Sequence, residues 1–214
     1  EDNRSRLESG NIPPDLERFG QIPGDTLDDC QMALERIRGG INLLDQEQKA
    51  AKAFQFANRA MADQRVRTVF TRRLRQGEEI TVEDVDIPQN RSWRPFQLAF
   101  ILLNLAALHD PTHPERSDRG GGLADLLWFP TGGGKTEAYL GVAAFAMGIR
   151  RLQRDEGWLD GQAGVTVLMR YTLRLLTLQQ FQRAATLLCA CEVIRREDPD
   201  TWGDEPFRIG LWVG

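Results

Sequence analysis

The sequence predicts an α/β fold, in which part of a parallel sheet follows an α-helical N-terminal region. Three short apolar runs predict the strands, at residues 123–129, 164–169 and 207–213. Around them lie longer stretches whose apolar residues recur every three or four positions, which is typical of helices. Strands that alternate with helices favour a parallel, doubly wound sheet.

The chain is predicted to begin with an extended lead-in over residues 1–25, which are polar and rich in proline. A helical N-terminal region follows over residues 26–90. Its first helix is amphipathic, runs over about 27–44 and is strained at Gly39-Gly40. Its second helix runs over about 45–76, and the arginines at its far end form either a solvated charged face or a surface for the DNA backbone.

Three more helices are expected in the remainder of the chain. The first covers about residues 94–107 and is apolar on nearly all sides, so it is expected to be buried. Another starts at Lys135, directly after a run of three glycines. The last covers about residues 173–196 and leads to the third predicted strand.

The glycine run is the most informative feature of the chain. Residues 129–136 read Phe-Pro-Thr-Gly-Gly-Gly-Lys-Thr and lie between a predicted strand and a predicted helix, which is the context of a phosphate-binding P-loop. Backbone N–H groups of such a loop surround a phosphate, and the helix N-terminus adds a partial positive charge. The predicted contacts to nucleotide come from Thr131, Gly132, Gly133, Gly134, Lys135 and Thr136.

Lys135 and Thr136 carry the chemistry of this motif. The lysine is expected to reach the β- and γ-phosphates of ATP, and the threonine hydroxyl to hold Mg²⁺. The general pattern has a glycine five residues before Gly134, where this chain has Phe129. The alternative interpretation is a glycine-rich turn without a ligand.

Two further segments are candidate binding sites. Phe96 could stack on adenine while the amide of Gln97 reads the edge of the base, because an amide both donates and accepts; alternatively, the pair is packing plus a surface amide. After the second predicted strand, Arg170, Thr172 and Arg174 could hold nucleic-acid phosphates at a helix N-terminus. Otherwise this segment is a capped helix start with exposed arginines.

The composition is that of a globular protein. The net charge is −4, from 27 basic and 31 acidic residues, so a dominant basic surface is excluded, although local clefts can still bind nucleic acid. No apolar run approaches the roughly 18 residues of a membrane span, and no membrane partner is expected. Three cysteines without a signal peptide favour the cytoplasm.

Three motifs occur in a specific order: Arg94–Gln97, Phe129–Tyr139 and Met169–Gln180. In this order they resemble the first RecA-like domain of superfamily 2 helicases, and more specifically the large helicase of the DISARM anti-phage defence islands. Residues 54–61 are similar to the same group, and the resemblance covers roughly residues 26–214.

The resemblance implies that residues 91–214 are the first part of a RecA-like motor domain, truncated before the Walker B motif. It also implies ATP and Mg²⁺ as cofactors, and DNA and a protein of the same defence system as partners. A fragment of this kind would lack the motifs for turnover. The alternatives are a P-loop ATPase that acts as a switch or assembly factor without nucleic acid, and an interaction scaffold that binds no nucleotide.

Overall fold

The computed structural model describes residues 22–116, 122–130, 132–155, 160–171 and 174–212. Within these ranges the chain is helical and contains no β-strand. The long helices are α2 (Ile22–Gln46), α3 (Gln48–Arg75), α4 (Pro95–His109), α5 (Lys135–Leu152) and α6 (Arg174–Glu197). The short helix α7 (Pro199–Trp202) follows α6, and two 3₁₀ turns, η2 (Pro88–Asn90) and η3 (Pro114–Arg116), flank α4.

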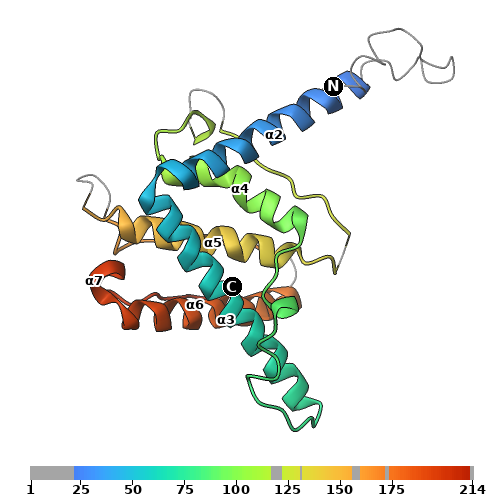
Figure 1. Cartoon of the computed structure of the whole chain (residues 1–214), viewed down its shortest axis with the longest axis vertical. Coiled ribbons are helices and arrows are strands. Elements are labelled where there is room, and N and C mark those ends of the chain that lie inside the picture. Colours follow the sequence, from blue (N-terminus) through green and yellow to red (C-terminus); the bar gives the residue numbers. More distant parts are fainter. Residues whose placement is uncertain (1–21, 117–121, 131, 156–159, 172–173, 213–214) are drawn as a thin grey trace, which may run out of the picture.

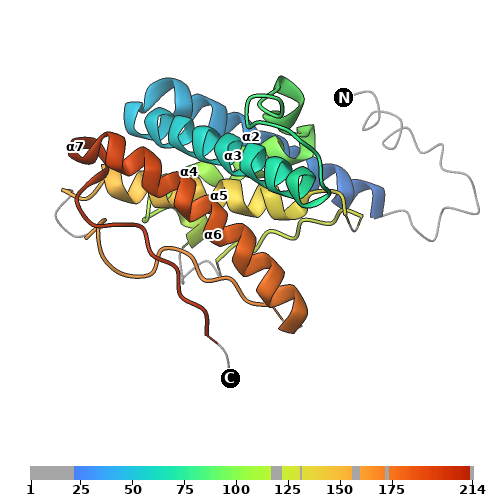
Figure 2. The same ribbon diagram turned by 90° about the horizontal axis from the view of Figure 1, so that it is seen from below.

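The helices form two layers. In Figure 1, α4, α5 and α6 lie roughly side by side, and α3 crosses them obliquely. Figure 2 shows α2 and α3 on one side of α4 and α5, with the segments 122–130, 160–171 and 203–212 on the other. The predicted helices over 45–76, 94–107 and 173–196 are confirmed within a few residues at their ends, because their apolar periodicity agrees with how they pack.

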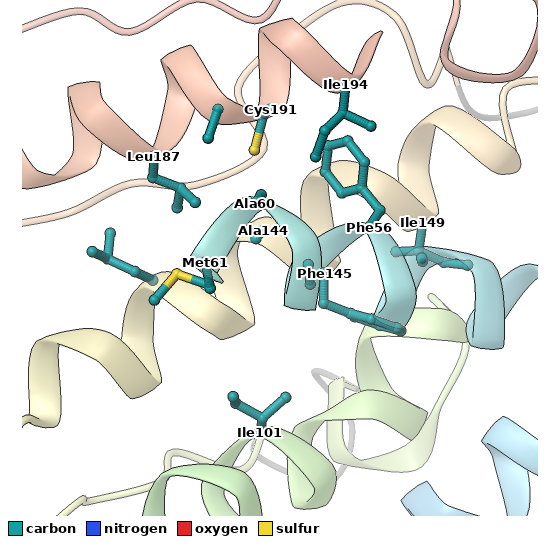
Figure 3. Packing of buried hydrophobic residues seen from close by; sticks show 14 of the residues in the cluster. Phe56, Ala60, Met61, Ile101, Ala144, Phe145, Ile149, Leu187, Cys191 and Ile194 are labelled. Atoms are coloured by element: carbon teal, nitrogen blue, oxygen red, sulfur yellow. The ribbon is translucent and has the colours of Figure 1, made fainter. Parts of the chain in front are cut away.

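The centre of the core is the contact between α3 and α5. Small residues of α3, such as Ala53 and Ala60, are fully buried, and α5 faces them with Ala144 and Gly148. A Cβ atom on Gly148 would lie 3.0 Å from the Phe56 ring, so the two helices approach as closely as glycine and alanine allow. Figure 3 shows this cluster, to which α6 adds the buried side chains of Leu187, Cys191 and Ile194.

Helix α4 is buried or half-buried over nearly its whole length, as its apolar sequence predicts. Phe100, Ile101, Leu102 and Leu105 are its most buried apolar residues, and Ile101 reaches Gly141 of α5. Although α4 is the most apolar helix, it has only 15 residues. No helix in the described part of the chain is both long and apolar enough to cross a membrane.

The predicted fold class, an α/β fold with a partial RecA-like parallel sheet, is wrong for the residues that the structure describes. Segments 122–130, 160–171 and 203–212 are extended, but no backbone ladder joins them. Several of their large apolar side chains remain in solvent: Trp128 and Leu168 are each 89% exposed and Trp212 is 94% exposed, whereas Met169 and Phe207 pack against the helical core. An apolar run predicts a strand only where a neighbouring strand pairs with it, and here the helices pack directly on one another instead.

Arginine side chains hold these extended segments. Arg36 of α2 donates to both carboxylate oxygens of Asp125, at 2.5 and 2.8 Å. Arg150 of α5 donates to the carbonyl oxygens of Asp160, Ala163 and Val165 at 2.9–3.1 Å. The Arg150 guanidinium therefore satisfies backbone carbonyl groups that, in a sheet, would accept from N–H groups of a neighbouring strand.

The glycine pair in α2 does not interrupt the helix, and the two glycines differ in their surroundings. A Cβ atom on Gly40 would lie 2.1 Å from the carbonyl oxygen of Leu102, because α2 crosses α4 at this point. A Cβ atom on Gly39 would meet nothing within 4 Å. Of the two glycines, it is therefore Gly40 that the close approach of α2 to α4 requires.

We predict that Gly40→Ala destabilises the protein by about 1–3 kcal/mol or more, because backbone must move to accept the methyl group. Gly39→Ala is the matched control and should stabilise by up to about 1 kcal/mol through helix propensity. Denaturant unfolding of both variants measures the two effects. Equal effects of the same sign would contradict the packing of α2 on α4.

Candidate functional site

The glycine loop joins the extended segment 122–130 to the start of α5. Gly132 and Gly134 have φ angles of 79° and 93°, a left-handed conformation that favours glycine. A Cβ atom on Gly133 would lie 2.6 Å from the Phe129 ring, so a side chain is excluded there by contact. Thr131 lies outside the described residues. The structure thus requires glycine at all three positions.

The start of α4 holds this loop in place. The Nε2 atom of Gln97 donates to the carbonyl oxygen of Gly134 at 2.8 Å, and Arg94 Nη1 donates to that of Gly133 at 2.6 Å. The Oε1 atom of Gln97 accepts from the Arg94 backbone N–H at 2.8 Å. Gln97 is only 5% exposed. Its amide therefore bridges the first turn of α4 and the last residue of the loop.

Phe96 precedes Gln97 in the first turn of α4. Its ring stacks on that of Phe129, with centroids 3.9 Å apart and planes 13° apart. The structure therefore brings both predicted base-contacting residues, Phe96 and Gln97, to the glycine loop. Both already have protein partners there, and their contact with adenine remains a prediction.

Lys135 and Thr136 form the first turn of α5. The Lys135 ammonium donates to the carbonyl oxygen of Phe129 and so folds back over the loop. The N-cap residue is Gly134, whose missing side chain leaves the first N–H groups of the helix without a side-chain cap. An 18-residue helix with an uncapped N-terminus favours an anion at this end.

One wall of an open cleft of about 630 Å³ is formed by Arg94, Gln97, Gly132, Gly134, Lys135 and Thr136. This volume lies within the roughly 300–1,000 Å³ of small-molecule sites. The opposite wall comes from α3, where Asn58 Oδ1 accepts a 2.6 Å hydrogen bond from Trp93 Nε1. Six charged side chains line the cleft. One is the carboxylate of Glu137, and the other five are the cations Arg65, Arg91, Arg94, Lys135 and Arg183. The cleft is therefore suited to a polyanion.

Two of the charged side chains in the cleft belong to one ion pair. Arg183 of α6 donates to a carboxylate oxygen of Glu137 in the first turn of α5. Glu137 is 18% exposed and Arg183 is 33% exposed, so water screens the pair only in part. Arg91 is paired as well, with Asp86 at 3.0 Å, on the outer rim.

Sequence analysis did not identify several of these residues. Arg94 and Glu137 lie within the motifs Arg94–Gln97 and Phe129–Tyr139, but no role was predicted for either side chain. Arg65 was identified only as one of the arginines at the far end of the predicted helix over 45–76, and Arg183 carries no local signal. They lie 70 residues before and 48 residues after Lys135 in the chain, and only the packing of α3 and α6 brings them to the cleft.

The predicted nucleic-acid segment lies apart from the cleft lining. Arg170 is exposed at the end of the extended segment 160–171. Thr172 lies outside the described residues, as does the side chain of Arg174, whose backbone begins α6. The same helix supplies Arg183 to the cleft, so the predicted phosphate contacts and the cleft share one structural element.

Comparison with known proteins supports the resemblance found in the sequence. No protein-family model matches the chain. The DISARM protein DrmA of Bacillus paralicheniformis is 43% identical over 215 aligned residues, which include 99% of this chain. The match covers 18% of the length of that protein. The similarity to a DISARM protein predicted from the motifs is thus confirmed.

Proposed function

We propose that this chain carries the nucleotide-binding part of an ATP-dependent DNA helicase or translocase that acts in DISARM defence against phage. One observation supports the proposal most directly. A three-glycine loop precedes Lys135 and Thr136, which begin α5 at the wall of a cationic cleft. The similarity to a DISARM protein over 99% of the chain supports the biological setting. We place the protein in the cytoplasm, with a second protein of the same system as partner.

The residues of the cleft fit ATP with Mg²⁺. In this proposal Lys135 leaves the Phe129 carbonyl and binds the β- and γ-phosphates, while Thr136 contributes its hydroxyl to Mg²⁺. The ion would neutralise phosphate charge and hold the nucleotide in one orientation. Gly132, Gly133 and Gly134 let the backbone approach the phosphates closely, because no Cβ atom stands in the way.

The base is proposed to lie on the α4 side of the cleft, which Gln97 lines and next to which Phe96 stacks on Phe129. An amide offers two donor hydrogens and two acceptor lone pairs, and Gln97 uses one of each within the protein. One donor and one acceptor thus remain, which is the number that the edge of adenine requires. The base-reading contact is therefore compatible with the bonds that hold the loop.

The first test is Lys135→Ala in the full-length protein. We expect ATP hydrolysis to fall to background while the melting temperature changes little, because the half-buried Lys135 donates to a loop carbonyl and is not part of the hydrophobic core cluster. Lys52→Ala is the control: Lys52 bonds to Thr201 at 2.9 Å, outside the cleft lining, and the variant should keep its turnover. Normal hydrolysis by Lys135→Ala would refute the P-loop assignment.

The second test separates base reading by Gln97 from its support of the loop. Gln97→Ala should weaken ATP more than GTP, by an excess of about 1–3 kcal/mol for a bidentate contact. Arg94→Ala removes the other donor to the loop, at Gly133, and should weaken both nucleotides equally. Titration of both variants with both nucleotides gives the answer. Equal losses in Gln97→Ala would mean that this amide only supports the loop.

The third test concerns DNA. Arg170→Ala and Arg174→Ala should each lower DNA affinity and reduce the slope of log affinity against log salt by roughly 0.7–0.9, because each phosphate contact releases counterions. Arg196→Ala at the far end of α6, where Arg196 pairs with Glu192, is the control. Unchanged slopes in both variants and in the double variant, with ATPase activity indifferent to DNA, would favour the alternative of a nucleotide-dependent switch that does not act on nucleic acid.

A further inference from the structure

The ion pair between Glu137 and Arg183 places opposite charges where a nucleotide phosphate would bind. Glu137 lies two residues after Lys135, in the first turn of α5, and both side chains line the cleft. A carboxylate there is favoured by the helix dipole, but it would repel a bound polyphosphate. Arg183 offsets that negative charge in the structure.

Arg183 and two other arginines of the cleft, Arg91 and Arg94, have different kinds of partner. Arg94 is committed to the Gly133 carbonyl, a bond that supports the loop itself. Arg91 pairs with Asp86, in the loop that follows α3. Arg183 alone among these three has a partner in the first turn of α5, beside the two residues proposed to contact phosphate and Mg²⁺.

We propose that Arg183 binds the phosphates of the nucleotide and that Glu137 holds it in position before they arrive. This inference rests on the proposed function. A polyphosphate carries more charge than one carboxylate and presents oxygens in the geometry that a guanidinium binds with two parallel hydrogen bonds. Phosphate therefore competes successfully with Glu137 for Arg183, and α6 contributes directly to the nucleotide site.

A purely structural role would make different predictions for the two partners. If the pair only clamps α5 to α6, removing either charge weakens nucleotide binding alike, through loss of the same contact. If Arg183 binds phosphate, Arg183→Gln removes a ligand contact, whereas Glu137→Gln removes a repulsive charge and releases Arg183. The two substitutions then act in opposite directions.

The experiment measures the binding of ATP and of inorganic tripolyphosphate to the full-length protein in EDTA, so that no effect of Glu137 on Mg²⁺ intervenes. Arg183→Gln should weaken both ligands by about tenfold or more, the value of a hydrogen bond to a charged group. Glu137→Gln should bind both at least as tightly as the parent. Because the contact is with phosphate, the change should be the same for ATP and tripolyphosphate.

The matched control is the pair Arg59–Glu197, which joins α3 to α6 at 2.5 Å and does not line the cleft. Arg59→Gln and Glu197→Gln should leave both affinities at the parental value. Melting temperatures show whether each variant is folded. Should Arg183→Gln fail to fold, Arg183→Lys keeps the charge without the planar fork and is expected to lose part of the affinity.

Parental affinity in the Arg183 variants, or equal weakening by Arg183→Gln and Glu137→Gln, would overturn the inference. The proposed function has its own signature: if the parent binds neither ligand, or if Lys135→Ala binds both as tightly as the parent, the P-loop assignment itself fails. Loss in Lys135→Ala with no loss in the Arg183 variants would reject only the role of Arg183.

Discussion

The close packing of α3 on α5 is the constraint on which the rest of the structure depends. Alanine and glycine at the crossing let the two backbones approach. The Phe56 ring packs so close to Gly148 that a Cβ atom there would lie only 3.0 Å from it. Helix α5 also packs against α4 and α6, so neighbouring helices fix the direction of its axis. The N-terminus of α5, and with it Lys135 and Thr136, therefore has a defined position at the wall of the cleft.

A second constraint follows from the first, because a fixed helix needs a fixed loop. The carbonyl groups of Gly133 and Gly134 accept hydrogen bonds from Arg94 and Gln97, and the Phe96 ring stacks on Phe129 at the start of the turn. The first turn of α4 thus holds the loop in position, although the sequence predicted a strand directly before the loop. The extended segment before the loop contributes little burial of its own, as the exposure of Trp128 shows.

The sequence predicted the helices and the glycine loop well but failed on the sheet. Helices are local: the spacing of Phe100, Ile101 and Leu105 and the proline at the start of α4 are visible in a short window. Strand pairing is not local, and the apolar run over residues 123–129 does not indicate which strand, if any, would pair with it. The same limit applies to the cleft, because Arg65 and Arg183 reach it only through the packing of helices that are far apart in the chain.

The cleft also depends on both parts into which the sequence divides the chain. Arg65 and Asn58 come from α3, within residues 26–90, whereas the loop, α5 and Arg183 come from residues 91–214. The core is continuous across this boundary, since Ala53 and Phe56 pack in one cluster with Phe145 and Leu187. A movement of α3 relative to α5 would therefore change the charge around Lys135 as well as the core. Helix α3 is therefore part of the wall of the cleft, and its Arg65 adds to the positive charge that surrounds Lys135.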